Sequence, residues 1–258
     1  MPTLAHSASS APRVQMLEKF TPATFEELDP LHRHRVTLMP MGEPLTCTHG
    51  LPLGDCTSPS CPRWLGDPQD RLPWKTGWAM SEYSGTSPHD TYMGDLVHRA
   101  KYGDAPRSER EEAAEEIALR MMSFIDYTYG RDSPPFSACI TAPSHNPKTM
   151  DLAARLCTLI ANAFALRDWT DLLRNSSPTE SVKTLRSGVD RYRVLENSIT
   201  VTPIGDDRAV GGLLFVDDVF ETGATARAVC EAIRAHYPQQ EFHVLTATRR
   251  PANTWGSR

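Results

Sequence analysis

The sequence predicts an α/β fold in which helices cover both faces of one mainly parallel sheet. Short apolar or β-branched runs alternate with amphipathic segments from Phe136 to Thr248, and prolines, glycines or polar residues separate them. Because strand–helix–strand units cross over in the right-handed sense, the strands they join are expected to run parallel. The 258 residues are enough for one domain of good size with additions.

Two helices are expected before the first of these strands. They cover residues 91–104 and 108–125, and glutamates in the first turns of the second suit the start of a helix. The apolar positions at helical spacing are Met93, Leu96, Val97 and Ala100 in the first, and Ala113, Ile117, Met121 and Phe124 in the second.

The remaining elements follow in strand–helix order. The apolar, proline-bounded run 136–142 predicts a buried strand, and 150–166 carries a helical stripe of leucines. The polar segment 175–193 indicates a loop or flap. Strands are expected at 198–203, 210–216 and 242–248, with a helix at 224–236.

The first third of the chain differs in composition. Residues 1–90 are rich in Pro, Ser, Thr and Gly, so they indicate loops, short helices and an accessory element. The predicted organisation is an N-terminal accessory region, 1–90, followed by an α/β domain, 91–258.

Charge and apolar patterning exclude several classes of protein. A net charge of -5 and a pI near 6.0 argue against bulk attraction to nucleic acid or to anionic membranes. The apolar runs are far shorter than the ~20 residues that span a bilayer. No secretory signal is visible at the N-terminus, so the expected location is cytoplasmic.

The accessory region contains a cluster of potential metal ligands. Cys47, His49, Cys56 and Cys61 lie within fifteen residues, separated by Gly- and Pro-rich sequence. Three thiolates and an imidazole can bind Zn²⁺ tetrahedrally, and a closed set of four protein ligands indicates a structural site. The alternative is that these cysteines are buried free thiols.

Two adjacent aspartates follow the strand at 210–216. Asp217 and Asp218 are expected where this strand gives way to a loop, at the carboxyl edge of the sheet where α/β proteins bind ligands. The turn from Thr222 to Thr225, which includes Gly223 and Ala224, leads into a helix whose free N–H groups can bind phosphate. Paired carboxylates beside a phosphate site suit the hydroxyls of a sugar. The predicted ligand is therefore a phosphorylated sugar with a cis-diol, with a divalent cation nearby.

The same segment, VDDVFETGAT from Val216 to Thr225, resembles the phosphoribosyl pyrophosphate (PRPP) signature of type I phosphoribosyltransferases. The resemblance implies a Rossmann-like parallel sheet with an accessory hood, and a PRPP ligand bound with Mg²⁺. It also implies that the two aspartates hold the ribose hydroxyls and that Thr222–Thr225 hold the 5-phosphate. Glu221 stands where an acidic residue acts as general base in some members; the alternative is a solvated loop residue. The simpler alternative for the segment is a strand end followed by an ordinary helix cap.

The order of segments from about residue 47 to 248 resembles the ComF-like branch of this family. One departure is that the chain has SHNPKTMD where the branch carries an Arg-Gly-Phe-Asn motif, so the chemistry on the pyrophosphate side could differ or be lost. This connection, 142–148, is nevertheless the expected pyrophosphate loop, with Pro143, Ser144, His145 and Lys148 as candidates. The alternative is an ordinary solvated connection. Lys101 either reaches the diphosphate or is a solvated cation at a helix end.

Two functions are consistent with these features. The first is a PRPP-dependent phosphoribosyltransferase that passes the phosphoribosyl group to a nitrogen of a base or amine and releases pyrophosphate, with Asp217, Asp218 and Glu221 as catalytic residues. The second is a non-catalytic PRPP or nucleotide sensor that acts through a protein or nucleic-acid partner. Loss of the Arg-Gly motif favours the sensor, whereas the acidic pair and Glu221 favour the enzyme.

Overall fold

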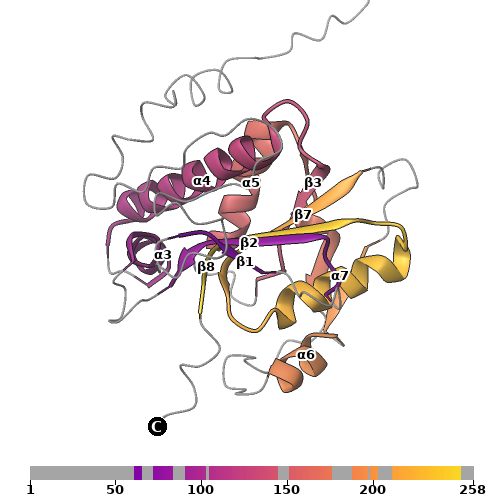
Figure 1. Cartoon of the computed structure of the whole chain (residues 1–258). Coiled ribbons are helices and arrows are strands. Elements are labelled where there is room, and N and C mark those ends of the chain that lie inside the picture. The colour runs from indigo at the N-terminus through magenta and orange to yellow at the C-terminus, as the bar shows by residue number, and fades with distance from the viewer. Residues whose placement is uncertain are drawn as a thin grey trace, which may run out of the picture.

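A mostly parallel sheet forms the centre of the protein (Figure 1). The computed structural model describes residues 61–65, 72–83, 91–102, 105–144, 151–175, 188–196, 198–202 and 211–250. Within these ranges six strands pair in the order β1-β2-β8-β7-β3-β4, and every neighbouring pair is parallel except β1–β2. The strands are β1 (Arg63–Trp64), β2 (Thr76–Glu82), β3 (Phe136–Ile140), β4 (Arg167–Asp168), β7 (Gly212–Phe220) and β8 (Phe242–Arg249).

Helices cover both faces of this sheet, as the sequence predicts. Figure 1 shows α4 and α5 on one side and α6 and α7 on the other. The helices are α3 (Tyr92–Tyr102), α4 (Arg107–Tyr129), α5 (Leu152–Phe164), α6 (Gly188–Glu196) and α7 (Ala224–His236). A short 3-10 helix, η1 (Thr170–Leu172), leads into a separate antiparallel pair, β5 (Leu173–Asn175) and β6 (Ile199–Val201).

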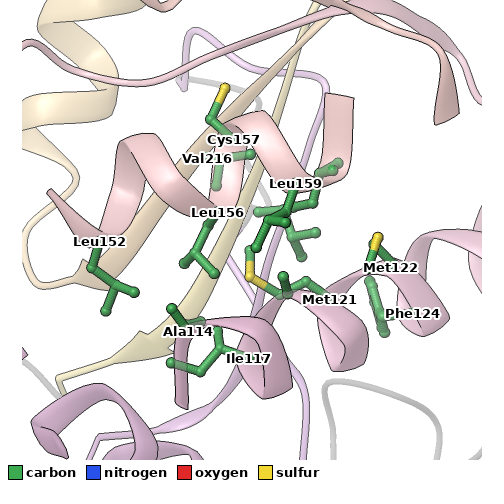
Figure 2. Close-up of a cluster of buried hydrophobic side chains, with 14 of the residues drawn as sticks. Ala114, Ile117, Met121, Met122, Phe124, Leu152, Leu156, Cys157, Leu159 and Val216 are labelled. Carbon is green, nitrogen blue, oxygen red and sulfur yellow. The ribbon is translucent and has the colours of Figure 1, made fainter. Parts of the chain in front are cut away.

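The core is divided by the sheet into two apolar clusters. Side chains alternate along β7, so Leu214 and Val216 join the cluster beneath α3, α4 and α5, whereas Leu213 and Phe215 join the cluster beneath α7. Figure 2 shows α5 presenting its apolar side chains toward α4 in the first cluster, with Val216 nearby. The two faces of β7 are therefore fixed by packing, which also fixes the side chains at its carboxyl end.

Three expectations about the elements were wrong. The range 72–83 contains β2, although the sequence indicated no strand there. The strand expected at 198–203 is present as β6, but its expected place in the parallel sheet was wrong, because among the described strands it pairs antiparallel with β5. The segment expected to be a loop or flap ends in a helix, α6. The division of the chain at residues 90 and 91 stays a prediction.

None of the helices in the described part of the chain is both long enough and apolar enough to cross a bilayer.

Candidate functional site

The site lies where the chain reverses its direction across the sheet. From β3 the chain passes through α5 to β4, and from β7 it passes through α7 to β8, so the two crossovers leave in opposite directions. Their helices therefore cover opposite faces, and the carboxyl ends of β3 and β7 mark the topological switch point of the sheet. The last residue pair between these strands is Ile140 with Phe215, whereas β7 continues to Phe220 beside β8 alone. In the described residues Val216–Phe220 therefore have no strand partner on the β3 side, and we call this stretch the slot along β7.

The acidic pair lies in this slot, within the strand rather than in the loop that the sequence indicated. Asp217 pairs with Thr246 of β8 in the sheet register. Asp218 is buried and Asp217 is partly buried. By strand alternation Asp218 faces the α3 side and Asp217 the α7 side. Asp217 also accepts a hydrogen bond from the main-chain N–H of Asp218 at 2.8 Å.

Lys101 comes from the last turn of α3 and forms an ion pair with this acidic site. Its Nζ lies 2.5 Å from Oδ2 of Asp218, with 26% of the lysine side chain and 8% of the aspartate side chain exposed. Burial disfavours the ammonium, but the Asp218 carboxylate outweighs it and raises the pKa of Lys101. The alternative of a solvated cation at the helix end was wrong, because Lys101 is paired with Asp218. Contact with a diphosphate stays a prediction.

The surroundings of Asp217, the second carboxyl group of the pair, disfavour its charged form. Burial, and next the neighbouring Asp218 carboxylate, raises the pKa of Asp217 to about 8, although Lys101 acts in the opposite direction. One ammonium therefore serves two carboxylates. Such a site favours a further cation or a set of hydroxyl donors.

Two threonines of β8 support the main chain at the acidic pair. Thr248 Oγ1 donates to the carbonyl oxygen of Asp218 at 3.1 Å, and Thr246 Oγ1 donates to the carbonyl oxygen of Thr248 at the same distance. Both threonines are fully buried. Sequence reasoning missed them, although two hydroxyls at alternate positions of an apolar strand were a visible signal.

The turn after β7 leads to the amino end of α7. Glu221 is partly buried, Thr222 is exposed and Ala224 begins the helix. Gly223 is the N-cap residue, with a φ of 74°, and a Cβ there would lie 2.8 Å from the ring of Phe220, so glycine is required. No side chain caps the helix in N-cap geometry; Thr222 Oγ1 accepts from the N–H of Ala224 only at 3.4 Å. The start of α7 thus places backbone N–H groups and the positive end of the helix dipole at the carboxyl edge of the sheet.

The connection from β3 to α5 differs from the turn before α7, because it ends at a helix that is capped by a side chain. Pro143 is half-buried and Ser144 is exposed after β3, whereas His145 and Lys148 lie outside the described residues. Asp151 caps α5, and its carboxylate accepts from the N–H of Ala154 at 3.1 Å. Sequence reasoning did not identify this cap. A carboxylate at the start of α5 occupies the position that an anion would take.

A further cation that the sequence interpretation did not include stands at the end of β8. The guanidinium of Arg250 lies over the ring of Tyr83 at 4.6 Å, and its main-chain N–H donates to the carbonyl oxygen of Phe220 at 2.8 Å. Burial raises the pKa of Tyr83, while Arg250 and Lys101 both act to lower it. Positive charge therefore gathers on the α3 and β8 side of the acidic pair.

The predicted zinc site cannot be assembled from the described residues. Cys61 is buried immediately before β1, while Cys47, His49 and Cys56 lie outside the described ranges. In those ranges no group of three or more Cys, His, Asp or Glu side chains could hold a metal ion. The zinc site stays a prediction.

No protein-family model and no curated protein matches the chain. Two solved structures show a distant similarity. The xanthine-guanine-hypoxanthine phosphoribosyltransferase of Helicobacter pylori has a TM-score of 0.36 at 12% identity, over 57% of this chain and 79% of that chain. A hypoxanthine phosphoribosyltransferase of Staphylococcus aureus has a TM-score of 0.33 at 12% identity, over 56% of this chain and 69% of that chain. Similarity at these TM-scores does not establish a shared fold or activity.

Proposed function

We propose that the protein is a PRPP-dependent phosphoribosyltransferase that transfers the phosphoribosyl group to a nitrogen of a base or an amine. The observation that carries the proposal is the placement of the acidic pair in the slot along β7, directly before the uncapped start of α7. The sequence of this segment resembles the PRPP signature of type I phosphoribosyltransferases. Acidic groups for a diol and helix-start N–H groups for a phosphate thus belong to one strand–turn–helix unit.

The proposed binding mode follows the order of these groups along the chain. The ribose hydroxyls donate to the carboxylates of Asp217 and Asp218, and the 5-phosphate accepts from the N–H groups of Thr222–Thr225 at the start of α7. The diphosphate at C1 then points away from α7, toward Lys101 and the connection after β3. Pro143, Ser144 and His145 belong to that connection as proposed contacts.

The residues at the slot fit a magnesium complex of PRPP. Two adjacent carboxyl groups stand beside one ammonium, that of Lys101, and burial together with the Asp218 carboxylate raises the pKa of Asp217. A divalent cation would offset both effects. When bound, Mg²⁺ would neutralise charge on the departing diphosphate. Asp217 and Asp218 are the residues that would stand nearest to it.

The transfer itself would depend on positioning and on proton removal. A nitrogen of the acceptor attacks C1, the bond from C1 to the diphosphate oxygen breaks, and pyrophosphate leaves with the bonding electrons. Glu221, after the end of β7, would take the proton from the attacking nitrogen. The carboxylates below the ribose ring would stabilise positive charge that develops at C1 and its ring oxygen.

One observation favours the alternative, a PRPP or nucleotide sensor without catalysis. The amino end of α5, on the expected pyrophosphate side, is occupied by the carboxylate of Asp151. The sequence there also lacks the Arg-Gly motif of ComF-like proteins. A sensor would bind PRPP through the same β7 residues and pass the signal to a protein or nucleic-acid partner.

Pyrophosphate release from PRPP, measured against a panel of bases and amines, separates the two functions. We expect turnover in the wild-type protein, and we expect Glu221→Gln to lower it by ~100-fold while PRPP affinity is kept. Glu241→Gln is the matched control, because Glu241 forms an exposed ion pair with Lys75 at the other end of the sheet. PRPP binding without turnover on any acceptor would support the sensor; absence of PRPP binding would exclude both.

A further inference from the structure

The ion pair between Lys101 and Asp218 connects two parts of the chain that are 117 residues apart. Lys101 is placed by α3, whose Met93, Leu96, Val97 and Ala100 are buried against the sheet. The ammonium therefore reaches Asp218 from a packed helix. The contact is a built part of the ligand-free site and not a chance pairing of mobile surface charges.

This contact conflicts with the proposed role of Asp218. An Oδ2 atom that accepts an ammonium at 2.5 Å is engaged already, and the side chain is almost fully buried. A ribose hydroxyl that donates to the same carboxylate has to share it with the ammonium or displace it. Displacement alone would leave a partly buried lysine without a partner, which is unfavourable.

A diphosphate on the neighbouring carbon resolves the conflict. In PRPP the diphosphate is attached to C1, adjacent to the carbon that carries the first ring hydroxyl of the diol. A lysine that contacts the carboxylate under the diol is therefore within reach of the diphosphate through rotation of its flexible four-carbon stem. The diphosphate also carries more negative charge than a single carboxylate.

We infer that Lys101 is an exchangeable counter-ion that holds Asp218 in the ligand-free protein and passes to the diphosphate when PRPP binds. This inference rests on the proposed function. It gives the ion pair a role in specificity, because a sugar phosphate with the diol but no diphosphate breaks the pair and offers the ammonium no new partner. The site then discriminates against ribose 5-phosphate, which is the rest of the PRPP molecule.

The inference predicts opposite effects of one substitution on two ligands. In Lys101→Met, PRPP loses its partner for the diphosphate, so we expect its Kd to rise by about 10-fold or more. Ribose 5-phosphate no longer has to break an ion pair, so its Kd is expected to stay the same or to fall. Calorimetry with both ligands gives the ratio of the two constants.

Three further variants make the result decisive. Lys75→Met removes a lysine from an exposed ion pair, with Glu241 3.1 Å away, and should change neither affinity. Lys101→Arg keeps the charge and should keep the preference for PRPP. Lys101→Gln is a second neutral variant that can still donate to Asp218, in case the methionine variant does not fold.

A parallel loss of affinity for both ligands in the neutral variants would mean that Lys101 is structural and would overturn the inference. Equal Kd values for PRPP and ribose 5-phosphate in the wild-type protein would overturn it as well. If the wild-type protein binds neither ligand, the proposed function fails first, and the inference fails with it.

Discussion

Helices α5 and α7 begin at the same edge of the sheet, on its opposite faces, and they differ in their N-cap residue. At α7 the N-cap residue is Gly223, which has no side chain. At α5 the N-cap residue is Asp151, whose carboxylate accepts from the helix N–H of Ala154. The N-cap backbone differs as well, because Asp151 is extended whereas Gly223 is left-handed. We therefore expect the start of α7 to accept an anion, whereas at α5 the carboxylate of Asp151 already occupies that position.

The largest effect is expected from making the start of α7 resemble that of α5. Thr222→Asp puts a carboxylate on the exposed residue before Gly223, where it would repel the 5-phosphate. We expect the Kd for PRPP to rise by about 100-fold, because two anions would be brought within a few ångströms of each other. Calorimetry measures this value.

Thr222→Asn is the matched control for this substitution. It has nearly the same shape as the aspartate variant without the charge, so its affinity should change by less than about 5-fold. If both variants lost the same affinity for PRPP, the shape of the side chain at position 222, and not its charge, would control binding. The contrast between α7 and α5 would then have no electrostatic basis.

A second prediction concerns the stability cost of burying Asp217, the member of the acidic pair that faces the α7 side. Asp217 has a folded pKa near 8, raised from the usual 3.8 chiefly by burial. Between these values the folded protein holds a proton that the unfolded chain has released, so this group makes stability fall as the pH rises. Asp217→Asn removes the effect while keeping an oxygen for the N–H of Asp218.

We therefore expect Asp217→Asn to be more stable than the wild-type protein at pH 9, by about 1–3 kcal/mol, with a smaller difference at pH 5. Urea unfolding at the two pH values measures the difference. Asp218→Asn should change stability in the opposite direction, because it takes the carboxylate away from Lys101. If the gain of the Asp217 variant did not depend on pH, the assigned cause would be wrong.

The smallest effect is expected at the closed helix. Asp151→Ala removes the cap of α5 and should lower the free energy of unfolding by about 1 kcal/mol. The PRPP affinity should change by less than about 3-fold, since this helix start is not assigned to the ligand. A large loss of affinity with unchanged stability would place the ligand at α5 as well and would end the distinction between the two helices.

Sequence patterns predicted the elements whose buried faces are apolar. The helix at 224–236 was predicted with the bounds that α7 has, because its small and apolar residues recur at helical spacing. In contrast, the buried face of β2 is formed by Gly77, Ala79 and Ser81, and such small residues leave no apolar signal in the sequence.

The candidate site could be predicted only in part for a similar reason. The residues of the acidic pair and of the turn before α7 are contiguous, so a local motif was enough to find them. Their burial depends on how far β3 pairs along β7, which no local pattern encodes. Lys101 was a candidate, but its pairing with Asp218 depends on tertiary packing and was not predicted. The threonines of β8 are brought in by the same packing and were missed.

The length of the slot along β7 is set by the residue at which β3 stops pairing with β7. Pairing with β3 stops at Phe215, so Val216–Phe220, a length of roughly 16 Å at about 3.3 Å per residue, pair with β8 alone among the described strands. If β3 paired two residues further, its backbone would fill the space beside Asp217 and Asp218, and the same acidic residues would lie against a closed sheet. Lengthening or shortening β3 would therefore resize the ligand space without any change to the residues that line β7.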